Sequence, residues 1–183
     1  MRAIIMAGGK RERLNMDVEK PLIEIEGKTI LERISTALRN AKVDEILVAI
    51  TKNTPRTEEK ARKLNLKTIR TPGEGYVEDT QFLKGKFNEF LSVSADLPFL
   101  TSSLIKDLLA KYNELKRPIS VVTSKQSYKK MGLSPSLTIG DFVPIGLNIV
   151  TEGKDCFYSI EGKETISFNS REELERILHE GRS

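Results

Sequence analysis

The residues best suited to chemistry lie in the first 22 positions, MRAIIMAGGKRERLNMDVEKPL. An apolar run that ends at Ala7 predicts a strand buried on both faces, and Gly8 and Gly9, which follow it directly, let a ligand approach the backbone. Positive charge comes next, from Lys10, Arg11, Arg13 and Lys20. Amides and cations just beyond a buried strand are typical of phosphate sites in α/β proteins. We therefore predict a nucleoside triphosphate site, with a tight turn and a solvated basic loop as the alternative.

An acid follows another apolar run, in the stretch SVSADLP at residues 92–98. At the end of a buried strand, Asp96 is placed to hold Mg2+, which usually takes one or two carboxylates together with substrate phosphates. The alternative role for Asp96 is a helix N-cap or a hydrogen bond within its loop. The sequence identifies no second metal-binding acid, since Asp141 and Asp155 are weak candidates.

Alternating strands and helices must position these residues. Apolar runs predict strands at residues 3–7, 22–26, 45–51, 66–70, within 87–96, and at 119–123, 142–150 and 165–168. Capping and helical periodicity predict helices at 29–41, 54–64, 101–115 and from 170 onward. Residues 71–80 are predicted to be a loop that enters a further helix, and residues 125–140 to be irregular. This order favours an α/β fold, one three-layer α/β/α domain over residues 1–183 with a mainly parallel, Rossmann-like sheet. Loops 8–20, 51–54, 71–79 and 94–98 should then meet at the carboxyl edge of the strands, where such sheets bind ligands.

Composition and missing motifs exclude several other classes of site. One cysteine, Cys156, and one histidine, His179, make an internal disulfide, a cysteine-rich zinc site and a Ser-His-Asp triad unexpected. Neither G-x-x-x-x-G-K-[ST] nor a G-x-G-x-x-G after the first strand is present. A net charge of +4 suits an anionic small molecule, whereas 6% aromatics without tryptophan give nucleic-acid binding little support. We expect a cytoplasmic protein without a membrane span or signal peptide, and the sequence leaves its oligomeric state undetermined.

The opening motif resembles the signature of the MobA-like nucleotidyltransferases, which have a glycosyltransferase-A-like fold, the nucleotide-diphospho-sugar transferase type. Within them the chain is similar to the archaeal adenosylcobinamide-phosphate guanylyltransferases over nearly its whole length. The segments that carry the resemblance are Met6-Ala7-Gly8-Gly9-Lys10, Arg13-Leu14, Glu19-Lys20-Pro21-Leu22, Asn53-Thr54-Pro55, Gly75-Tyr76-Val77-Glu78-Asp79, Ser94-Ala95-Asp96-Leu97, Val143-Pro144 with Asn148, and Asn169 before a capped helix.

The resemblance implies transfer of GMP from GTP to the phosphate of adenosylcobinamide phosphate, with release of pyrophosphate, in cobalamin biosynthesis. The residues implied at the nucleotide are Ala7, Gly8, Gly9, Lys10, Arg13, Lys20, Asn53, Gly75, Glu78, Asp79 and Asp96. Arg13, Lys20 and Asp96 are the implied catalytic residues: Arg13 neutralises the leaving group with Lys10, Lys20 contacts the α-phosphate or the acceptor, and Asp96 holds Mg2+. Pro144 and Asn148 are implied to border the acceptor.

Two points leave alternatives open. Glu78 or Asp79 is expected to accept hydrogen bonds from guanine, but capping of a helix start is an equal alternative for either. Relatives usually have glycine where this chain has Arg11, and a Cβ there resists positive φ. Arg11 keeps open a nucleotide-binding module without catalysis. A molybdenum-cofactor guanylyltransferase and a sugar-phosphate nucleotidyltransferase, which share the opening motif, are the other enzyme interpretations.

Overall fold

The computed structural model describes residues 1–9, 18–133, 135, 137–168 and 173–175. A seven-stranded sheet runs through the described part in the order β5-β4-β1-β6-β8-β7-β9. Strands β5, β4, β1 and β6 are mutually parallel, whereas β8 is antiparallel to both of its neighbours, and β9 is parallel to β7. The strands are β1 (Arg2–Met6), β4 (Glu45–Ile50), β5 (Lys67–Arg70), β6 (Phe90–Ser94), β7 (Ile119–Ser124), β8 (Phe142–Val150) and β9 (Cys156–Ser159).

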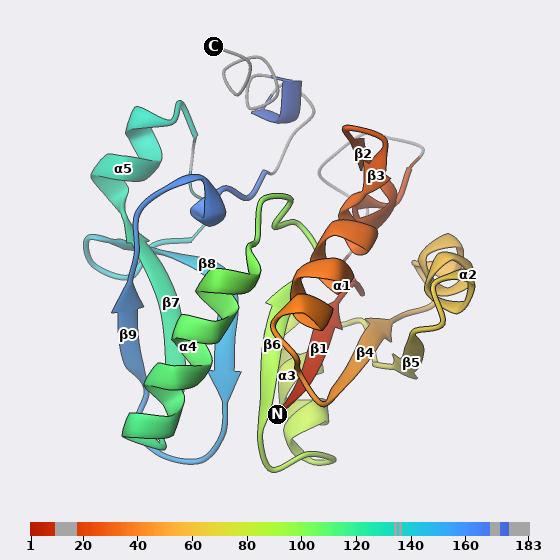
Figure 1. The fold of residues 1–183 in the computed structure, drawn as a ribbon, viewed down its shortest axis with the longest axis horizontal. Helices are drawn as coiled ribbons and strands as arrows, with labels where there is room; N and C mark the ends of the chain where they lie inside the picture. The colour runs from red at the N-terminus through yellow and green to blue at the C-terminus, as the bar shows by residue number, and fades with distance from the viewer. Residues whose placement is uncertain (10–17, 134, 136, 169–172, 176–183) are drawn as a thin grey trace.

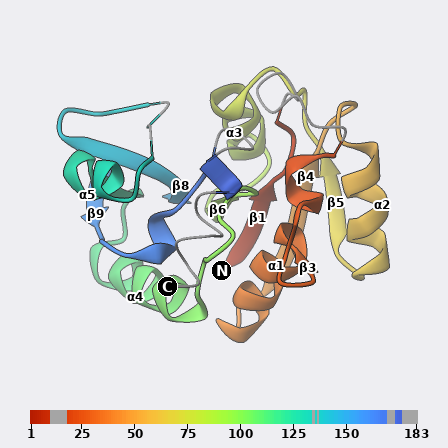
Figure 2. The ribbon, with the colours of Figure 1, turned by 90° about the horizontal axis from the view of Figure 1, so that it is seen from above.

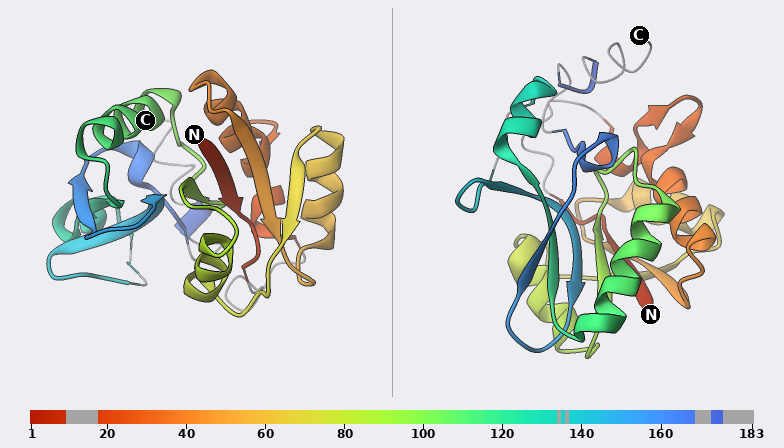
Figure 3. Two further views of the ribbon diagram at one scale, coloured as in Figure 1. Left: turned by 90° about the horizontal axis from the view of Figure 1, so that it is seen from below. Right: turned by 60° about the vertical axis from the view of Figure 1, so that its left-hand side comes forward.

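Helices cover both faces of this sheet. α1 (Ile30–Asn40) and α4 (Ser102–Leu115) lie on one face, and α3 (Tyr76–Lys84) lies on the other (Figures 2 and 3). α2 (Pro55–Lys63) lies beside β4 and β5 at the end of the sheet (Figure 1). The expected α/β fold with a mainly parallel sheet is confirmed.

Alternation of side chains along the strands creates a separate apolar core on each face. The larger core contains Ile5, Leu91 and Leu147 and lies under α1 and α4. The smaller core, under α3, contains Ile4, Leu47, Ala49, Leu83 and Phe90. Because β1 contributes Ile4 to one core and Ile5 to the other, it is buried on both faces, as its apolar run predicted.

Local capping explains where the helices begin. Thr29 and Glu32 form a capping box at α1, and the Thr101 hydroxyl accepts a hydrogen bond from the Leu104 amide at α4. Ser124 caps α5 (Lys125–Lys130) in the same way.

Three expectations for the elements are wrong, those for residues 125–140, 22–26 and 165–168. Residues 125–140 begin with helix α5, because Ser124 supplies a cap that the sequence analysis did not weigh. Residues 22–26 do not form one strand: η2 (Lys20–Leu22) precedes a small hairpin of β2 (Glu24–Ile25) and β3 (Lys28–Thr29). Glu26 and Gly27 both adopt positive φ, which turns the chain too early for a longer strand.

Near the end of the chain, the sheet gains a strand that was not expected. β9 pairs with β7, whereas the predicted strand at 165–168 is replaced by η3 (Lys163–Thr165) and an extended segment. Ile166 and Phe168 are buried in the larger core, but they do not belong to a strand. Their apolar character therefore reflects burial, not sheet pairing. The helix expected from residue 170 is described only at residues 173–175, which are helical.

Candidate functional site

The carboxyl ends of β1, β4, β5 and β6 lie at one edge of the sheet, the upper edge in Figure 1. Gly8, just after β1, lies beside the loops that follow β4 and β5. The Thr51 hydroxyl donates to the Gly8 carbonyl over 3.3 Å. A Cβ placed on Gly8 would lie 2.6 Å from Thr51 Cγ2, 3.3 Å from Asp79 Oδ2 and 3.5 Å from Thr71 Oγ1. Three of the loops predicted to meet therefore do so around a glycine.

Gly9, the next residue, has a different environment. No atom of the described residues lies within 4 Å of a Cβ built on it, and Gly9 is exposed. Gly8 is therefore a packing glycine, whereas Gly9 leaves open space beside the backbone. Ala7, in contrast, is buried at the end of β1, where its amide donates to the Ala49 carbonyl over 3.0 Å.

The loop before α3 is held by one of its own acids. Asp79 is 5% exposed, and its Oδ1 accepts a hydrogen bond from the Gly73 amide over 2.8 Å. Glu78 is exposed, with its carboxylate beside Gly75, whose φ of 157° suits glycine. Neither acid caps the start of α3: Asp79 holds the preceding loop through the Gly73 amide, and the Glu78 carboxylate is accessible from solvent.

The turn after β4 carries Asn53 next to this loop. The backbone amide of Asn53 donates to Thr51 Oγ1 over 3.2 Å, so the same hydroxyl contacts both Asn53 and Gly8. Thr51 thus ties the turn with Asn53 to the glycine after β1.

Lys20 and Asp96 come together although they are far apart in the sequence. Lys20 Nζ lies 3.8 Å from Asp96 Oδ2 and donates to the Phe168 carbonyl over 2.8 Å. Asp96 Oδ1 accepts from the Ser94 hydroxyl over 2.6 Å. Both charged side chains keep part of their surface exposed, 29% for Lys20 and 22% for Asp96. Both charged groups can therefore reach a bound substrate, while the Phe168 carbonyl orients Lys20 and the Ser94 hydroxyl orients Asp96.

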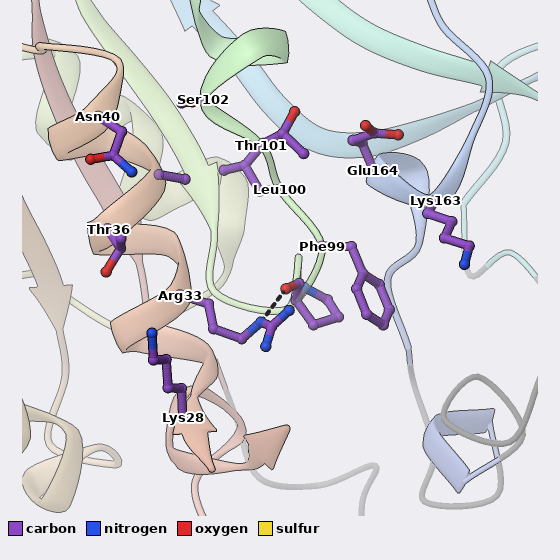
Figure 4. A pocket seen from close by; sticks show the side chains of 12 residues that line it. Lys28, Arg33, Thr36, Asn40, Phe99, Leu100, Thr101, Ser102, Lys163 and Glu164 are labelled. Atoms are coloured by element: carbon purple, nitrogen blue, oxygen red, sulfur yellow. Dashed lines mark hydrogen bonds between the residues drawn. The ribbon is translucent and has the colours of Figure 1, made fainter. Parts of the chain in front are cut away.

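Arg33 of α1 braces the loop that begins at Asp96. Its Nε donates to the Pro98 carbonyl over 2.9 Å (Figure 4), and its Nη1 donates to the Ile25 carbonyl over 3.2 Å. One guanidinium thus connects the Asp96 loop to the β2 strand that follows Lys20.

A cavity of about 530 Å3 lies beside Arg33, on the α1 side of this loop (Figure 4). Of the site residues predicted from the sequence, none is among the residues that line it, which include Lys28, Arg33, Phe99, Thr101 and Lys163. Pro98 also lines the cavity, which therefore adjoins the loop that begins at Asp96.

The two predicted acceptor residues lie on β8. Pro144 and Asn148 are four residues apart on this strand and so face the same side of the sheet, away from the buried Ile145 and Leu147. The Asn148 amide nitrogen donates to the Tyr76 hydroxyl over 2.7 Å.

Glu19 is the residue whose role the sequence analysis missed. It is 2% exposed, and its carboxylate accepts hydrogen bonds from the amides of Arg56 and Thr57 at 3.1 and 2.7 Å and from the Thr57 hydroxyl at 2.6 Å. These amides belong to the first turn of α2, where backbone amides have no acceptor within the helix, so Glu19 caps a helix far from it in the chain. The sequence feature that could have pointed to a role for Glu19 is its position directly before Lys20 in the opening motif.

Lys10, Arg11, Arg13 and Asn169, together with His179, lie outside the described residues. Within the described part, no group of three or more acids, histidines or cysteines could by itself hold a metal ion. None of the helices described there is long and apolar enough to cross a bilayer.

Comparisons with known proteins agree with this arrangement. The family model described as "MobA-like NTP transferase domain" matches residues 3–138. An adenosylcobinamide-phosphate guanylyltransferase of Methanocaldococcus jannaschii is 35% identical over 163 residues, which cover 82% of this chain and 81% of that protein. A bifunctional GlmU protein of Clostridium botulinum is 27% identical over 67% of this chain, which spans 28% of that longer protein.

The fold itself occurs in a solved structure of a CMP:2-keto-3-deoxy-manno-octonic acid synthetase in complex with CTP. The two superpose with a TM-score of 0.71 over 99% of this chain and 98% of the other, at 12% identity. The match to the family model covers most of the chain, and the glycine turn, Lys20 and Asp96 lie at the sheet edge where such folds bind ligands. The chain belongs to the MobA-like NTP transferases.

Proposed function

We propose that this chain transfers GMP from GTP to the phosphate of adenosylcobinamide phosphate and releases pyrophosphate. The observation that carries the proposal is the 35% identity to the guanylyltransferase of Methanocaldococcus jannaschii across four fifths of both chains. The pairing of Lys20 with Asp96 beside the glycine turn supports it, because both charges lie at the edge where a triphosphate is expected.

In this reaction an oxygen of the acceptor phosphate forms a bond to the α-phosphorus of GTP, and the bond from that phosphorus to the β-phosphate oxygen breaks. Negative charge builds on the departing pyrophosphate, so positioning and charge neutralisation dominate catalysis. Lys10 and Arg13 would neutralise the pyrophosphate, and the open space beside Gly9 admits the phosphates to the backbone. Lys20, fixed by the Phe168 carbonyl, would contact the α-phosphate or the acceptor.

Mg2+ would be held by Asp96 together with substrate phosphates. A single carboxylate fits this use, because Mg2+ commonly takes one or two protein carboxylates and completes its shell with phosphate and water. Bound there, the ion would supply charge that stabilises the developing negative charge. Ser94 orients the carboxylate through its hydrogen bond to Oδ1.

For the base, Glu78 and Asn53 are the proposed contacts, since Asp79 is buried and engaged by Gly73. Gly75 leaves room for the Glu78 carboxylate. Pro144 and Asn148 would border the acceptor from β8. A cytoplasmic location, a single domain and small-molecule partners belong to the same proposal.

The test is a pyrophosphate-release assay with GTP and Mg2+, with and without adenosylcobinamide phosphate. We expect release that depends on both substrates, and much slower release when ATP or CTP replaces GTP. Release with a hexose 1-phosphate but not with the corrinoid would instead favour a sugar-phosphate nucleotidyltransferase. Nucleotide binding without release under any condition would favour a module that lacks catalysis.

Asp96→Asn provides the test of the site. We expect turnover to fall by roughly 10²- to 10³-fold, because the neutral amide is a poor Mg2+ ligand and no longer balances Lys20. The melting temperature should change little, since Asp96 is partly exposed. Wild-type turnover in this variant would assign Asp96 a structural role, and the exposed Asp44→Asn serves as the matched control.

A further inference from the structure

Tyr76, the first residue of α3, joins the two halves of the site. Although the residue as a whole is 43% exposed, its hydroxyl lies 2.9 Å from the Ser92 hydroxyl on β6 and 2.7 Å from the Asn148 amide nitrogen on β8. Ser92 and Asn148 are direct partners in the antiparallel pairing of these strands. The Tyr76 side chain therefore contacts β6 and β8 at the point where Ser92 and Asn148 are paired.

Two hydrogen bonds meet at the Tyr76 hydroxyl. The Asn148 amide donates to the Tyr76 oxygen, and the hydroxyls of Tyr76 and Ser92 share a second hydrogen bond in which either can donate. Ser92 is fully buried, so it offers a fixed partner. Burial raises the pKa of Tyr76 above its ordinary value, and the hydroxyl therefore stays protonated near neutral pH. Tyr76 is thus suited to hold a neighbour in place, not to accept a proton from a substrate.

The position of α3 relates this group to the nucleotide. Glu78 and Asp79 lie two and three residues after Tyr76, and Asp79 faces Gly8 and folds the loop before the helix. Tyr76 also belongs to the Gly-Tyr-Val-Glu-Asp segment, yet no role in nucleotide binding accounts for it. The same turn of helix therefore contacts the nucleotide loop on one side and the acceptor strand on the other.

We propose that Tyr76 is a positioning residue for the acceptor: its hydroxyl fixes the Asn148 amide in the orientation that receives the acceptor substrate. The inference rests on the proposed function, because it takes β8 as the acceptor side of the site. Asn148 is partly exposed, and the one hydrogen bond that its side chain makes among the described residues uses the amide nitrogen, so the side-chain oxygen remains to accept a bond from a ligand. Without the tyrosine hydroxyl, the amide is free to rotate.

The experiment is a kinetic comparison of Tyr76→Phe with the wild-type protein, in which GTP and adenosylcobinamide phosphate are varied separately. We expect the KM for the corrinoid to rise roughly three- to tenfold, as for the loss of one hydrogen bond. The KM for GTP and kcat should stay within about twofold, since the ring remains to pack against the strands. Tyr158→Phe on β9 is the matched control and should leave all three parameters unchanged.

Two further variants separate positioning from stability. In an Asn148→Ala background, Tyr76→Phe should have no additional effect on the corrinoid KM, because the group that it orients is gone. Ser92→Ala removes the buried partner but keeps the bond between Tyr76 and Asn148. It should lower the melting temperature while raising the corrinoid KM less than Tyr76→Phe does.

Three outcomes would overturn the inference: an unchanged corrinoid KM in Tyr76→Phe, additive effects with Asn148→Ala, or an equal KM increase in Ser92→Ala. Each of these requires an active wild-type enzyme. Failure of the proposed function itself appears differently, as a wild-type protein that releases no pyrophosphate with the corrinoid.

Discussion

At the scale of single residues, the two glycines after β1 do different things although the sequence presents them as a pair. Gly8 is surrounded by Thr51, Thr71 and Asp79, and any side chain there would displace one of them. Among the described residues, nothing lies within 4 Å of a Cβ built on Gly9. The first glycine therefore serves the packing of the loops, and the second is available to a ligand.

Substituting each glycine with alanine distinguishes these roles. Gly8→Ala should lower the free energy of unfolding by about 1–3 kcal/mol, because its Cβ would overlap Thr51 Cγ2. Gly9→Ala should leave that free energy nearly unchanged and should weaken GTP binding, because its methyl group would occupy the space proposed for phosphates. Chemical denaturation and calorimetric titration with GTP measure the two effects. Unchanged GTP affinity in Gly9→Ala would contradict the phosphate assignment.

At the scale of elements, the strongest constraint on the site is Glu19, which fastens the segment before Lys20 to the start of α2. Helix starts favour negative charge because their first amides have no partner within the helix. Since Lys20 follows directly, the same contact limits where its ammonium can lie. The helix cap thereby positions a residue of the site.

Glu19→Gln should therefore affect both stability and turnover. Glutamine keeps the shape, but only its oxygen can accept, and its NH2 group turns a donor toward one of the groups that now donate to Glu19. We therefore expect a loss of about 1–3 kcal/mol in the free energy of unfolding. A fall in kcat should accompany it, because Lys20 loses its fixed approach to Asp96. Urea unfolding and steady-state kinetics give the two values, with the exposed Glu24→Gln as control. If stability falls and kcat does not, the cap does not position Lys20.

A second helix cap gives a pH dependence. A hydrogen bond from Lys60, followed by those from the Thr29 backbone and hydroxyl, lowers the pKa of Glu32 from 4.5 to about 2. A carboxylate with a lowered pKa stabilises the folded state fully above its unfolded pKa, and the contribution is lost as the pH falls toward the folded pKa.

Glu32→Gln should accordingly destabilise the protein most above pH 4.5, and the difference from wild type should shrink as the pH falls toward 2. Because the side chain is partly exposed, we expect a maximum difference of roughly 1–2 kcal/mol. Urea unfolding at several pH values measures it. A difference that is constant with pH would mean that the carboxylate's charge is unimportant there.

At the scale of the whole molecule, the parallel and antiparallel parts of the sheet carry different groups of the proposed site residues. The parallel strands β5, β4, β1 and β6 direct their following loops to one edge, where Gly8 and Asp96 lie. The antiparallel strand β8 then places Asn148 beside β6. Tyr76 bridges β6 and β8 across this boundary.

Because the proposed GTP site is built from several elements, nucleotide binding should stabilise the entire fold. At a free GTP concentration 100 times Kd, linkage gives about 2.7 kcal/mol, which corresponds to a rise in melting temperature of roughly 5–10 °C for a chain of this size. We expect smaller shifts with ATP and CTP at the same concentration. Equal shifts with all three nucleotides would contradict guanine selectivity.

The sequence by itself determined the features that depend on neighbouring residues. The apolar runs, the glycine turn after Ala7 and the caps at Thr29 and Thr101 follow from local geometry, so the alternating order of strands and helices was predictable. The parallel arrangement followed from that order, and with it the edge at which the loops meet.

The tertiary structure alone decided which distant groups touch. Glu19 reaches an amide 37 positions away, Tyr76 bonds Asn148 at a separation of 72, and Lys20 bonds the Phe168 carbonyl at a separation of 148. Such contacts leave no periodic signal in the chain, because they depend on how strands are ordered and which faces are covered. The insertion of β8 between β6 and β7 is the clearest case, since it brings Asn148 to Ser92 and Tyr76.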